Sequence, residues 1–413
     1  MAVPCSTEIA IAGIGVVSPF GLGMDCFHSA LKSGKSSIKQ IYRFPVKKWC
    51  PSTLGAFVPE FDLEELTGIP QKTRRLAPIS KLALAAAHLA LDDSEIPLNE
   101  ELAKNTGIFV GLSRFIMDQA EYFLQSIFSG KVHELLPIRP ESLHPHGPAV
   151  QLSQRYGITG PTITFPGSCV SGIHALETAR MYLSTRRINL AIVISTDSLS
   201  NFQFHMEGAS GILSSVKVPG FAPRPFDQKA DGCVLSEGSV ALILARQEDI
   251  KKQGPKMWGL ITGSNSLIEH RLLPYQANEA YDFSVIMNKL FSGLKQNDID
   301  MITTDARGIP ALDLAQSIGI RNAFEDNNKI PITSIQGHTG HAGGTSALFN
   351  IVSSILAMNS SQVPQILNLE QPPKEYNLNY VIKKPLKANV NKAAVLTHGW
   401  GGHHKAIFLR KKE

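Results

Sequence analysis

The sequence contains few cysteines, and their arrangement argues against two kinds of stabilised fold. They are odd in number, widely separated and include no CxxC pair. A disulfide framework or a structural zinc site needs cysteines in closely spaced sets. We therefore predict reduced thiols, of which one could serve as a nucleophile. The five are Cys5, Cys26, Cys50, Cys169 and Cys233.

Long apolar runs and targeting signals are also missing. No segment approaches the roughly 18 consecutive apolar residues that cross a bilayer. The first residues, MAVPCSTE, contain neither the basic region nor the apolar region of a secretory signal. The sequence thus predicts a cytoplasmic protein with no membrane partner.

The charge excess is small. The 40 basic and 35 acidic residues leave a net charge of +5, and no basic stripe with interleaved aromatic residues occurs. Nucleic-acid binding is therefore not predicted. Short basic runs at 251–252 and 410–412 fit either an acidic protein partner or ordinary solvated surface.

Strand-like and helix-like segments alternate along the 413 residues, a length greater than one hydrophobic core usually reaches. This alternation predicts a mostly parallel sheet with helices on its faces. The expected strands are 8–17, 107–111, 163–165, 190–195, 239–245, 258–262, 301–304, 332–334, 393–397 and 405–409. The expected helices are 24–33, 80–91, 149–156, 169–184, 280–294, 310–318 and 344–358.

Five motifs occur in a fixed order: AGIGVVSPFG at 12–21, GPTITFPGSCVSG at 160–172, RPFDQKADG at 224–232, TGHAGG at 339–344 and GWGG at 399–402. Together they resemble the β-ketoacyl-acyl-carrier-protein synthase family. This family includes elongating synthase II, the type II polyketide ketosynthases and their chain-length-factor relatives. One motif would be weak, but five in register extend over nearly the whole chain.

The resemblance implies an α/β thiolase fold, a five-layered α-β-α-β-α sandwich of two similar halves. We expect an N-terminal half at 1–250 with Cys169, and a C-terminal half at 251–413 with His341 and the GWGG loop. The resemblance also implies an obligate dimer, and acyl substrates carried on the phosphopantetheine of an acyl carrier protein. We expect no separate cofactor and no metal, because no set of ligands occurs at metal-binding spacing.

Cys169 is the predicted nucleophile. It stands at an expected strand–helix junction, where free backbone N–H groups and the helix dipole lower a thiol pKa. The resemblance implies that this thiol accepts the acyl group, and that the backbone N–H groups of Cys169 and Trp400 form the oxyanion hole. Gly399 and Gly401 flank Trp400, which either narrows the tunnel gate or simply replaces another aromatic residue. Phe202 is expected at the acyl tunnel or the dimer interface.

The sequence departs from the family at two catalytic positions. Elongating synthases use Cys-His-His with a supporting lysine, but here Arg307 replaces the first histidine and Gln336 replaces the lysine, so that only His341 remains. Arginine stays protonated and supplies no neutral imidazole nitrogen. Losing a positioned donor costs about 100- to 1000-fold in rate. His398, just before the GWGG loop, is the best candidate for compensation, ahead of His338, His403 and His404.

Three functions fit this incomplete set. The first, which we favour, is a chain-length-factor-like subunit that pairs with a complete ketosynthase, although such factors usually lose the cysteine. The second is an acyltransferase that works through a Cys169 acyl-enzyme. The third is a condensing enzyme that uses Arg307 and His398 in unusual roles. All three handle acyl thioesters in fatty-acid or polyketide assembly, as a homodimer or as a heterodimer with a relative.

Overall fold

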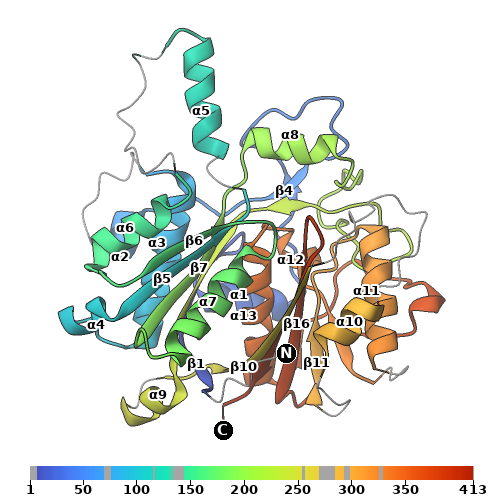
Figure 1. The fold of residues 1–413 in the computed structure, drawn as a ribbon. Helices are drawn as coiled ribbons and strands as arrows, with labels where there is room; N and C mark the ends of the chain where they lie inside the picture. Colours follow the sequence, from blue (N-terminus) through green and yellow to red (C-terminus); the bar gives the residue numbers. More distant parts are fainter. Residues whose placement is uncertain are drawn as a thin grey trace.

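The fold is seen in a computed structural model (Figure 1). It describes residues 7–68, 76–114, 117–131, 133, 144–253, 256–268, 284–292, 298–324 and 329–412. Part of the helix expected at 280–294 lies outside these ranges; the part inside forms α10 (Ser284–Leu290).

The strands repeat one pattern in the two halves of the chain. In each half a set of parallel strands is followed by two antiparallel strands. In the first half the order is β6 (Thr162–Pro166), β5 (Thr106–Leu112), β7 (Leu190–Asp197), β9 (Gly238–Arg246) and β1 (Ile9–Ser18). In the second half it is β14 (Asn379–Tyr380), β12 (Pro331–Thr333), β11 (Met301–Thr303), β16 (Lys392–Gly399), β17 (His403–Arg410) and β10 (Gly259–Ile268).

The two strand sets join where β1 pairs with β10, in antiparallel orientation. The prediction of a mostly parallel sheet therefore holds for the outer strands and is wrong for the centre. There β9, β1, β10 and β17 each run antiparallel to their neighbours. Alternation of strands and helices indicates parallel crossovers, but it does not show where a half ends on two antiparallel strands.

Helices complete five layers (Figure 1). Helix α3 (Pro78–Ser94), with α6 (Gly147–Tyr156), covers the outer face of the first sheet, and α10 with α11 (Pro310–Ala323) covers the second. Between the sheets lie α7 (Ser171–Ser184) and α13 (Thr345–Ser360), which contact each other. The predicted α-β-α-β-α sandwich is thus confirmed. The boundary between halves at residue 250 stays a prediction.

Burial on both faces explains the apolar strands. Along β1, Ile9 and Ile11 belong to the core around α7 and α13, whereas Ala10 and Ala12 belong to the core under α3. A strand covered on both sides has no polar face, and so its sequence reads as a continuous apolar run.

Smaller elements connect these layers, and one of them protrudes. Helix α5 (Met117–Phe128) projects at the top of the molecule beside α8 (Asn201–Ala209), which it contacts (Figure 1). Among the described residues, no helix has both the length and the apolar character needed to cross a membrane. The remaining elements are β2 (Gly21–Leu22), α1 (Met24–Lys32), β3 (Lys39–Gln40), β4 (Leu54–Ala56), α2 (Leu63–Thr67), α4 (Glu100–Lys104), β8 (Leu235–Ser236), α9 (Gln247–Gln253), α12 (Gln336–Thr339), β13 (Gln362–Val363), η5 (Lys374–Tyr376) and β15 (Leu386–Lys387).

Candidate active site

The candidate catalytic residues come from corresponding loops of the two halves. Cys169 lies between β6 and α7, and His341 lies between β12 and α13. Arg307 follows β11, and His398 lies near the end of β16. The carboxyl ends of parallel strands meet at one edge of a sheet. The repeated fold therefore brings these four residues together.

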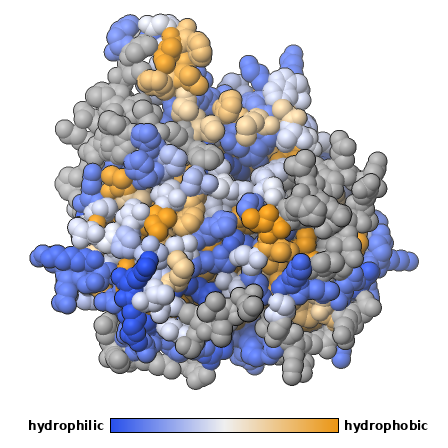
Figure 2. Space-filling view, in the orientation of Figure 1, coloured by the Kyte–Doolittle hydropathy of each residue, from blue (hydrophilic) through white to orange (hydrophobic). Residues whose placement is uncertain are grey.

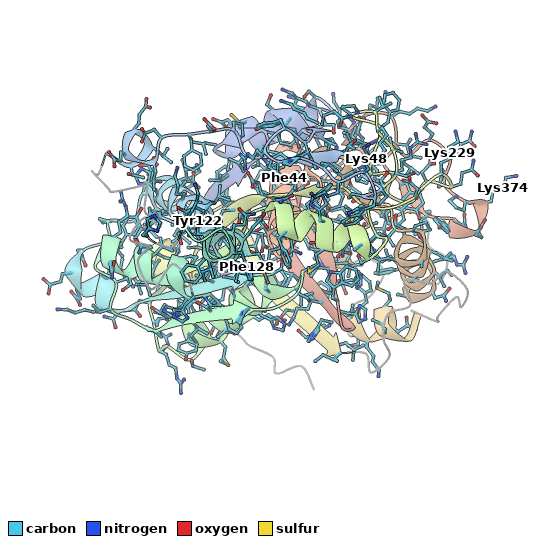
Figure 3. All side chains as sticks on the ribbon, turned by 90° about the horizontal axis from the view of Figure 1, so that it is seen from above. Phe44, Lys48, Tyr122, Phe128, Lys229 and Lys374 are labelled. Atoms are coloured by element: carbon cyan, nitrogen blue, oxygen red, sulfur yellow. The ribbon has the colours of Figure 1, made fainter. Side chains whose placement is uncertain are left out.

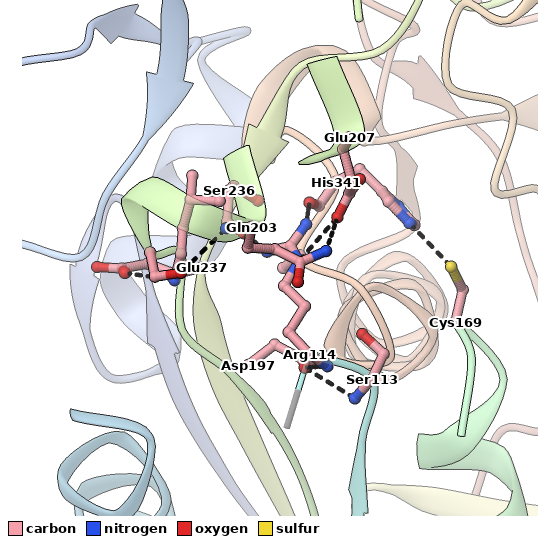
Figure 4. A network of polar contacts seen from close by, with 12 residues as sticks. Ser113, Arg114, Cys169, Asp197, Gln203, Glu207, Ser236, Glu237 and His341 are labelled. Carbon is pink, nitrogen blue, oxygen red and sulfur yellow. Dashed lines mark hydrogen bonds and ion pairs between the residues drawn. The ribbon is translucent and has the colours of Figure 1, made fainter. Parts of the chain in front are cut away.

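Three side chains meet at the centre of the site. The Cys169 Sγ lies 3.2 Å from His341 Nε2, and Arg307 Nη1 lies 2.7 Å from the same nitrogen. Arg307 Nη1 is also 3.5 Å from the Cys169 Sγ. All three residues are only 4% exposed. Figure 4 shows the thiol and the imidazole facing each other.

The arginine determines which nitrogen of His341 carries the proton. A guanidinium has donors only, so the contact requires the Nε2 of His341 to accept. In the neutral ring the proton is then on Nδ1, which has no hydrogen-bond partner within the described part of the chain. Burial, Arg307 and Arg114 all lower the pKa of His341, which keeps the ring neutral. In this arrangement Nε2 is a hydrogen-bond acceptor and cannot donate a proton to a substrate oxygen.

The environment of Cys169 differs from the sequence prediction. The helix begins at Ser171, two residues later than predicted, so that Cys169 precedes it. Burial raises the pKa of the Cys169 thiol, and the positive charge of Arg307 lowers it only in part. The expected lowering of the Cys169 pKa is therefore wrong, because desolvation disfavours the thiolate more than the nearby guanidinium favours it.

Arg307 is fixed by buried partners. Its Nη2 donates to Asp305 Oδ2 at 2.8 Å and to the His398 carbonyl oxygen at 2.9 Å. Its backbone N–H donates to Asp313 Oδ1 at 3.1 Å. Burial raises the pKa of Asp313 to about 7, although it accepts three backbone N–H groups. Breaking a buried ion pair costs about 3–5 kcal/mol. The pair with Asp305 therefore holds the Arg307 guanidinium in its position beside His341.

The two candidate helper residues are buried but have different surroundings. Gln336 is 1% exposed, and neither atom of its amide has a hydrogen-bond partner among the described residues. The His398 ring bonds to His404, with their Nδ1 atoms 2.7 Å apart, while the His398 carbonyl binds Arg307. Burial is the main cause that lowers the pKa of both histidines to about 3. His398 thus supports Arg307 through its backbone.

The lesser histidine candidates also have other contacts. The two ring nitrogens of His338 lie 3.0 and 2.9 Å from the carbonyl oxygens of Lys35 and Gln365. His403 stacks edge-on against His174, with ring centroids 6.0 Å apart. Among the described residues no group of three potential ligands could hold a metal ion.

A cavity of about 370 Å³ opens beside the thiol. Trp400 lines it, and the adjacent glycines allow the backbone to approach closely. A Cβ on Gly399 would lie 2.1 Å from Ser168 Oγ, and Gly401 has a φ of +80°. The lining residues are Ser113, Arg114, Met117, Ser168, Cys169, Gln203, Met206, Glu207, Ser210, His341, Gly343 and Trp400.

Phe202 does not line this cavity among the described residues. Its side chain is 51% exposed, while its helix neighbours Gln203, Met206 and Glu207 face the cavity. Phe202 lies four residues before Met206, at the exposed end of α8. Both positions predicted for it, the acyl tunnel and a dimer interface, stay predictions.

Sequence reasoning missed two charged residues in the cavity wall. Arg114 Nη2 donates to the His341 carbonyl oxygen at 2.9 Å, and its Nε lies 3.4 Å from Glu207 Oε1 (Figure 4). Gln203 Nε2 donates to the same carboxylate oxygen at 2.6 Å. The available signal was an arginine close behind an apolar strand: Arg114 is the second residue after β5, and Arg307 is the fourth residue after β11.

Known proteins resemble the chain over its whole length. The model of the β-ketoacyl synthase N-terminal domain matches residues 6–250, and that of the C-terminal domain matches 275–370. A putative mitochondrial 3-oxoacyl-[acyl-carrier-protein] synthase of Schizosaccharomyces pombe is 27% identical, covering 98% of this chain and 99% of the relative. The ketoacyl synthase beta subunit of the tetracenomycin polyketide synthase of Streptomyces glaucescens is 26% identical, covering 98% of each.

Solved structures share the fold. The ishigamide ketosynthase/chain length factor superposes with a TM-score of 0.87 at 18% identity, covering 98% of this chain and 100% of that one. The thiolase-type architecture predicted from the motifs is therefore confirmed by the structure itself and by its neighbours. Because the family models match more than half of its residues, the chain belongs to the β-ketoacyl synthase family.

Proposed function

We propose that the chain is a chain-length-factor-like subunit. It would bind acyl thioesters carried by an acyl carrier protein in fatty-acid or polyketide assembly, paired with a complete ketosynthase. One observation carries this proposal: Arg307 donates to the Nε2 of His341. The contact occupies the atom that would otherwise donate a hydrogen bond to the substrate.

The chemistry of condensation explains why this contact matters. A malonyl thioester that loses CO2 leaves an enolate, whose oxygen needs hydrogen-bond donors. Here the remaining histidine accepts at Nε2, and the first histidine position holds a guanidinium engaged by Asp305. Loss of general acid–base help costs roughly 100- to 10,000-fold. An isolated chain would therefore condense slowly.

Two surface features support a partner subunit. Strand β6 is the last in its sheet among the described strands, and an open edge is a ready template for pairing with another chain. Helix α5 also exposes four apolar side chains: Tyr122, Leu124, Ile127 and Phe128. Figure 2 shows apolar residues gathered on this helix, and Figure 3 shows Tyr122 and Phe128 beside α8.

A carrier protein is the second expected partner. Lys48, Lys229 and Lys374 are exposed and are seen in the view from above in Figure 3. An acidic carrier, which the family resemblance implies, would be attracted to exposed lysines such as these. The cytoplasmic location stays a prediction, since some relatives are named as mitochondrial.

The test compares three preparations: the chain alone, a complete ketosynthase alone, and the co-purified pair. Each receives acyl and malonyl carrier-protein thioesters, and the condensed product is measured by mass spectrometry. We expect product from the pair and little from the chain alone. Cys169→Ala in this chain should leave the output of the pair unchanged. Ordinary condensation by the chain alone, or loss of output in the Cys169→Ala pair, would contradict the proposal.

A second function, acyl transfer, is favoured by the contact of 3.2 Å between the Cys169 Sγ and His341 Nε2. The thiol proton would pass to Nε2 in place of the Arg307 hydrogen bond as the sulfur attacks the thioester carbonyl. The bond to the pantetheine sulfur then breaks, and the proton passes from Nε2 to the departing pantetheine thiolate. Intact-protein mass after mixing with a short acyl carrier-protein thioester tests this step. An adduct on the parent and none on Cys169→Ala would favour transfer; no adduct on either would rule it out for the isolated chain.

The third possibility, condensation with unusual roles for Arg307 and His398, has less support. The His398 ring contacts His404, and the guanidinium of Arg307 is shared among Asp305, His341 and a carbonyl group. Neither side chain is arranged as a spare donor toward the cavity.

A further inference from the structure

Two histidines lie opposite each other at the base of the hairpin that carries Trp400. Strands β16 and β17 pair in antiparallel orientation, and His398 is the direct cross-strand partner of His404. The chain turns through the GWGG loop at 399–402, from which Trp400 lines the cavity beside Cys169. The position of this hairpin base therefore determines where Trp400 lies in the cavity wall.

A side-chain hydrogen bond joins the two rings. Their Nδ1 atoms are 2.7 Å apart, and the ring centroids are 5.0 Å apart. His398 is 1% exposed and His404 is 0% exposed. Burial lowers the pKa of both histidines to about 3, which keeps the rings neutral. Since a bond between two imidazole nitrogens needs one donor and one acceptor, one ring carries its proton on Nδ1 and the other accepts there.

The backbone of His398 holds the arginine of the site. Its carbonyl oxygen accepts from Arg307 Nη2 at 2.9 Å, and its N–H donates to Asp305 Oδ2 at 2.8 Å. The same Nη2 donates to Asp305 Oδ2 at 2.8 Å, so that guanidinium, carboxylate and backbone bind one another. Arg307 Nη1 in turn donates to His341 Nε2. A shift of the His398 backbone would therefore move the guanidinium relative to His341.

A hydrogen bond fixes the hairpin base more narrowly than apolar contact would. Burial of apolar side chains is non-directional, so a pair of them tolerates small displacements. A hydrogen bond weakens steeply when its angle departs from linearity. A buried nitrogen that loses its partner also gains no compensating bond to water. The bond between His398 and His404 therefore resists sliding and twisting of β16 against β17.

We propose that His404 is a positioning residue of the active site. Through the ring of His398 it fixes two features: the carbonyl oxygen that binds Arg307 and the hairpin end that carries Trp400. This role rests on the part of the proposed function in which Arg307 occupies the Nε2 of His341. The histidine pair acts by holding the geometry of the site, and not by exchanging protons with a substrate.

The test follows Trp400 and His341 in the isolated chain. Trp49→Phe/Trp258→Phe leaves Trp400 as the single tryptophan, and acrylamide quenching of its fluorescence reports its contact with water. Nuclear magnetic resonance of isotope-labelled histidine reports which nitrogen of His341 carries the proton, and His341→Gln assigns its signals. Both measurements are made in this background, without any substrate.

Two variants of His404 separate the hydrogen bond from the volume of the side chain. His404→Leu removes the bond, whereas His404→Asn keeps a hydrogen-bonding amide at the place of Nδ1. We expect His404→Leu to raise the quenching constant at least about twofold, because the indole loses its fixed place in the cavity wall. It should also give a mixture of the two His341 tautomers. His404→Asn should match the parent in both measurements.

A histidine outside the pair controls for general effects. His88 is half-buried on α3, and His88→Leu should leave the quenching constant and the His341 tautomer as in the parent. The thermal unfolding midpoint shows whether each variant is folded. If His404→Leu does not fold, His404→Gln replaces it, because its amide lies at the place of Nε2 and so does not meet His398 Nδ1 in the same geometry.

Two results would overturn the inference. One is a quenching constant and a His341 tautomer that are the same in His404→Leu as in the parent. The other is a His404→Asn variant that differs from the parent as much as His404→Leu does, which would mean that side-chain volume alone sets the position. A parent with its proton on the Nε2 of His341 would contradict the proposed function, while the quenching series would still decide the role of His404.

Discussion

At the scale of single residues, Arg307 changes the chemistry of the site more than any other side chain in contact with the nucleophile. It donates to His341 and lies 3.5 Å from the sulfur, so that one cation faces both partners of the thiol–imidazole pair. Its charge lowers the pKa of His341 and also that of Cys169. The residue therefore weakens the base while it partly stabilises the thiolate.

Replacing both members of the ion pair at once should recover decarboxylation. Asp305→Asn/Arg307→His removes two buried charges together and frees the Nε2 of His341. Since one positioned donor is worth about 100- to 1000-fold, we expect CO2 release from malonyl carrier protein to rise at least about tenfold. Arg307→His alone should instead lower stability by about 3–5 kcal/mol, because Asp305 is left without its partner. An unchanged rate in the folded double variant would contradict this role.

The reactivity of Cys169 should depend on pH in a defined direction. Burial raises the pKa of the thiol, so alkylation by iodoacetamide should be slow at neutral pH and rise into the alkaline range. Arg307→Gln removes a charge that lowers this pKa, and should move the rise to still higher pH. Mass spectrometry of the labelled peptide measures the rate, with exposed Cys26 as the internal reference. A rate already at its plateau at neutral pH would contradict the prediction.

At the scale of elements, the AGIG segment acts through packing. A Cβ on Gly15 of β1 would lie 1.9 Å from the carbonyl oxygen of Ala86, and one on Gly13 would lie 2.2 Å from that of Ala90. Helix α3 therefore crosses β1 at backbone contact distance. Its alanine-rich sequence fits this approach, because small side chains leave room for the neighbouring strand.

Gly15→Val should consequently destabilise the protein. The added atoms meet backbone and not a flexible side chain, so α3 must shift away from β1, at a cost of about 3 kcal/mol or more. Urea unfolding followed by circular dichroism measures this loss. Gly167→Ala is a suitable control, because the nearest atom to its Cβ would be 3.5 Å away. Equal stability of the two variants would contradict the packing account.

At the scale of the whole molecule, the repeated fold assembles the site. Loops after β6 and β12 supply Cys169 and His341, and loops after β5 and β11 supply Arg114 and Arg307. Each half contributes a residue of the thiol–imidazole pair and an arginine. The site thus depends on the packing of α7 against α13, which holds the two loops together.

The exposed face of α5 should matter for association and not for folding. Phe128 is 85% exposed, so Phe128→Glu should leave the thermal midpoint of the isolated chain unchanged. If a second subunit covers α5, the same change should weaken association at least about tenfold, because a charge would be buried without a partner. Sedimentation equilibrium measures the association. Met181→Glu, at a site 54% exposed on α7, is the matched control. Equal association of parent and both variants would place the interface elsewhere.

The sequence by itself determined the family, the five-layered fold and the identity of the residues at Cys169, His341 and Arg307. These conclusions rest on local patterns: small residues around the nucleophile, alternating strands and helices, and motifs in a fixed order. It also gave the prediction that Arg307 and Gln336 replace a histidine and a lysine of the family. Such signals lie within short segments, so they can be recognised from the sequence without knowing the tertiary structure.

Only the tertiary structure decided what those residues contact. Segments far apart in the sequence create these contacts. They determine which ring nitrogen of His341 accepts from Arg307 and why the pKa of Cys169 is raised. They also determine the exposure of Phe202 and the pairing of Arg114 with Glu207. Desolvation and side-chain contact are properties of the packed core. No local pattern encodes them, because they arise only when both halves close around the cavity.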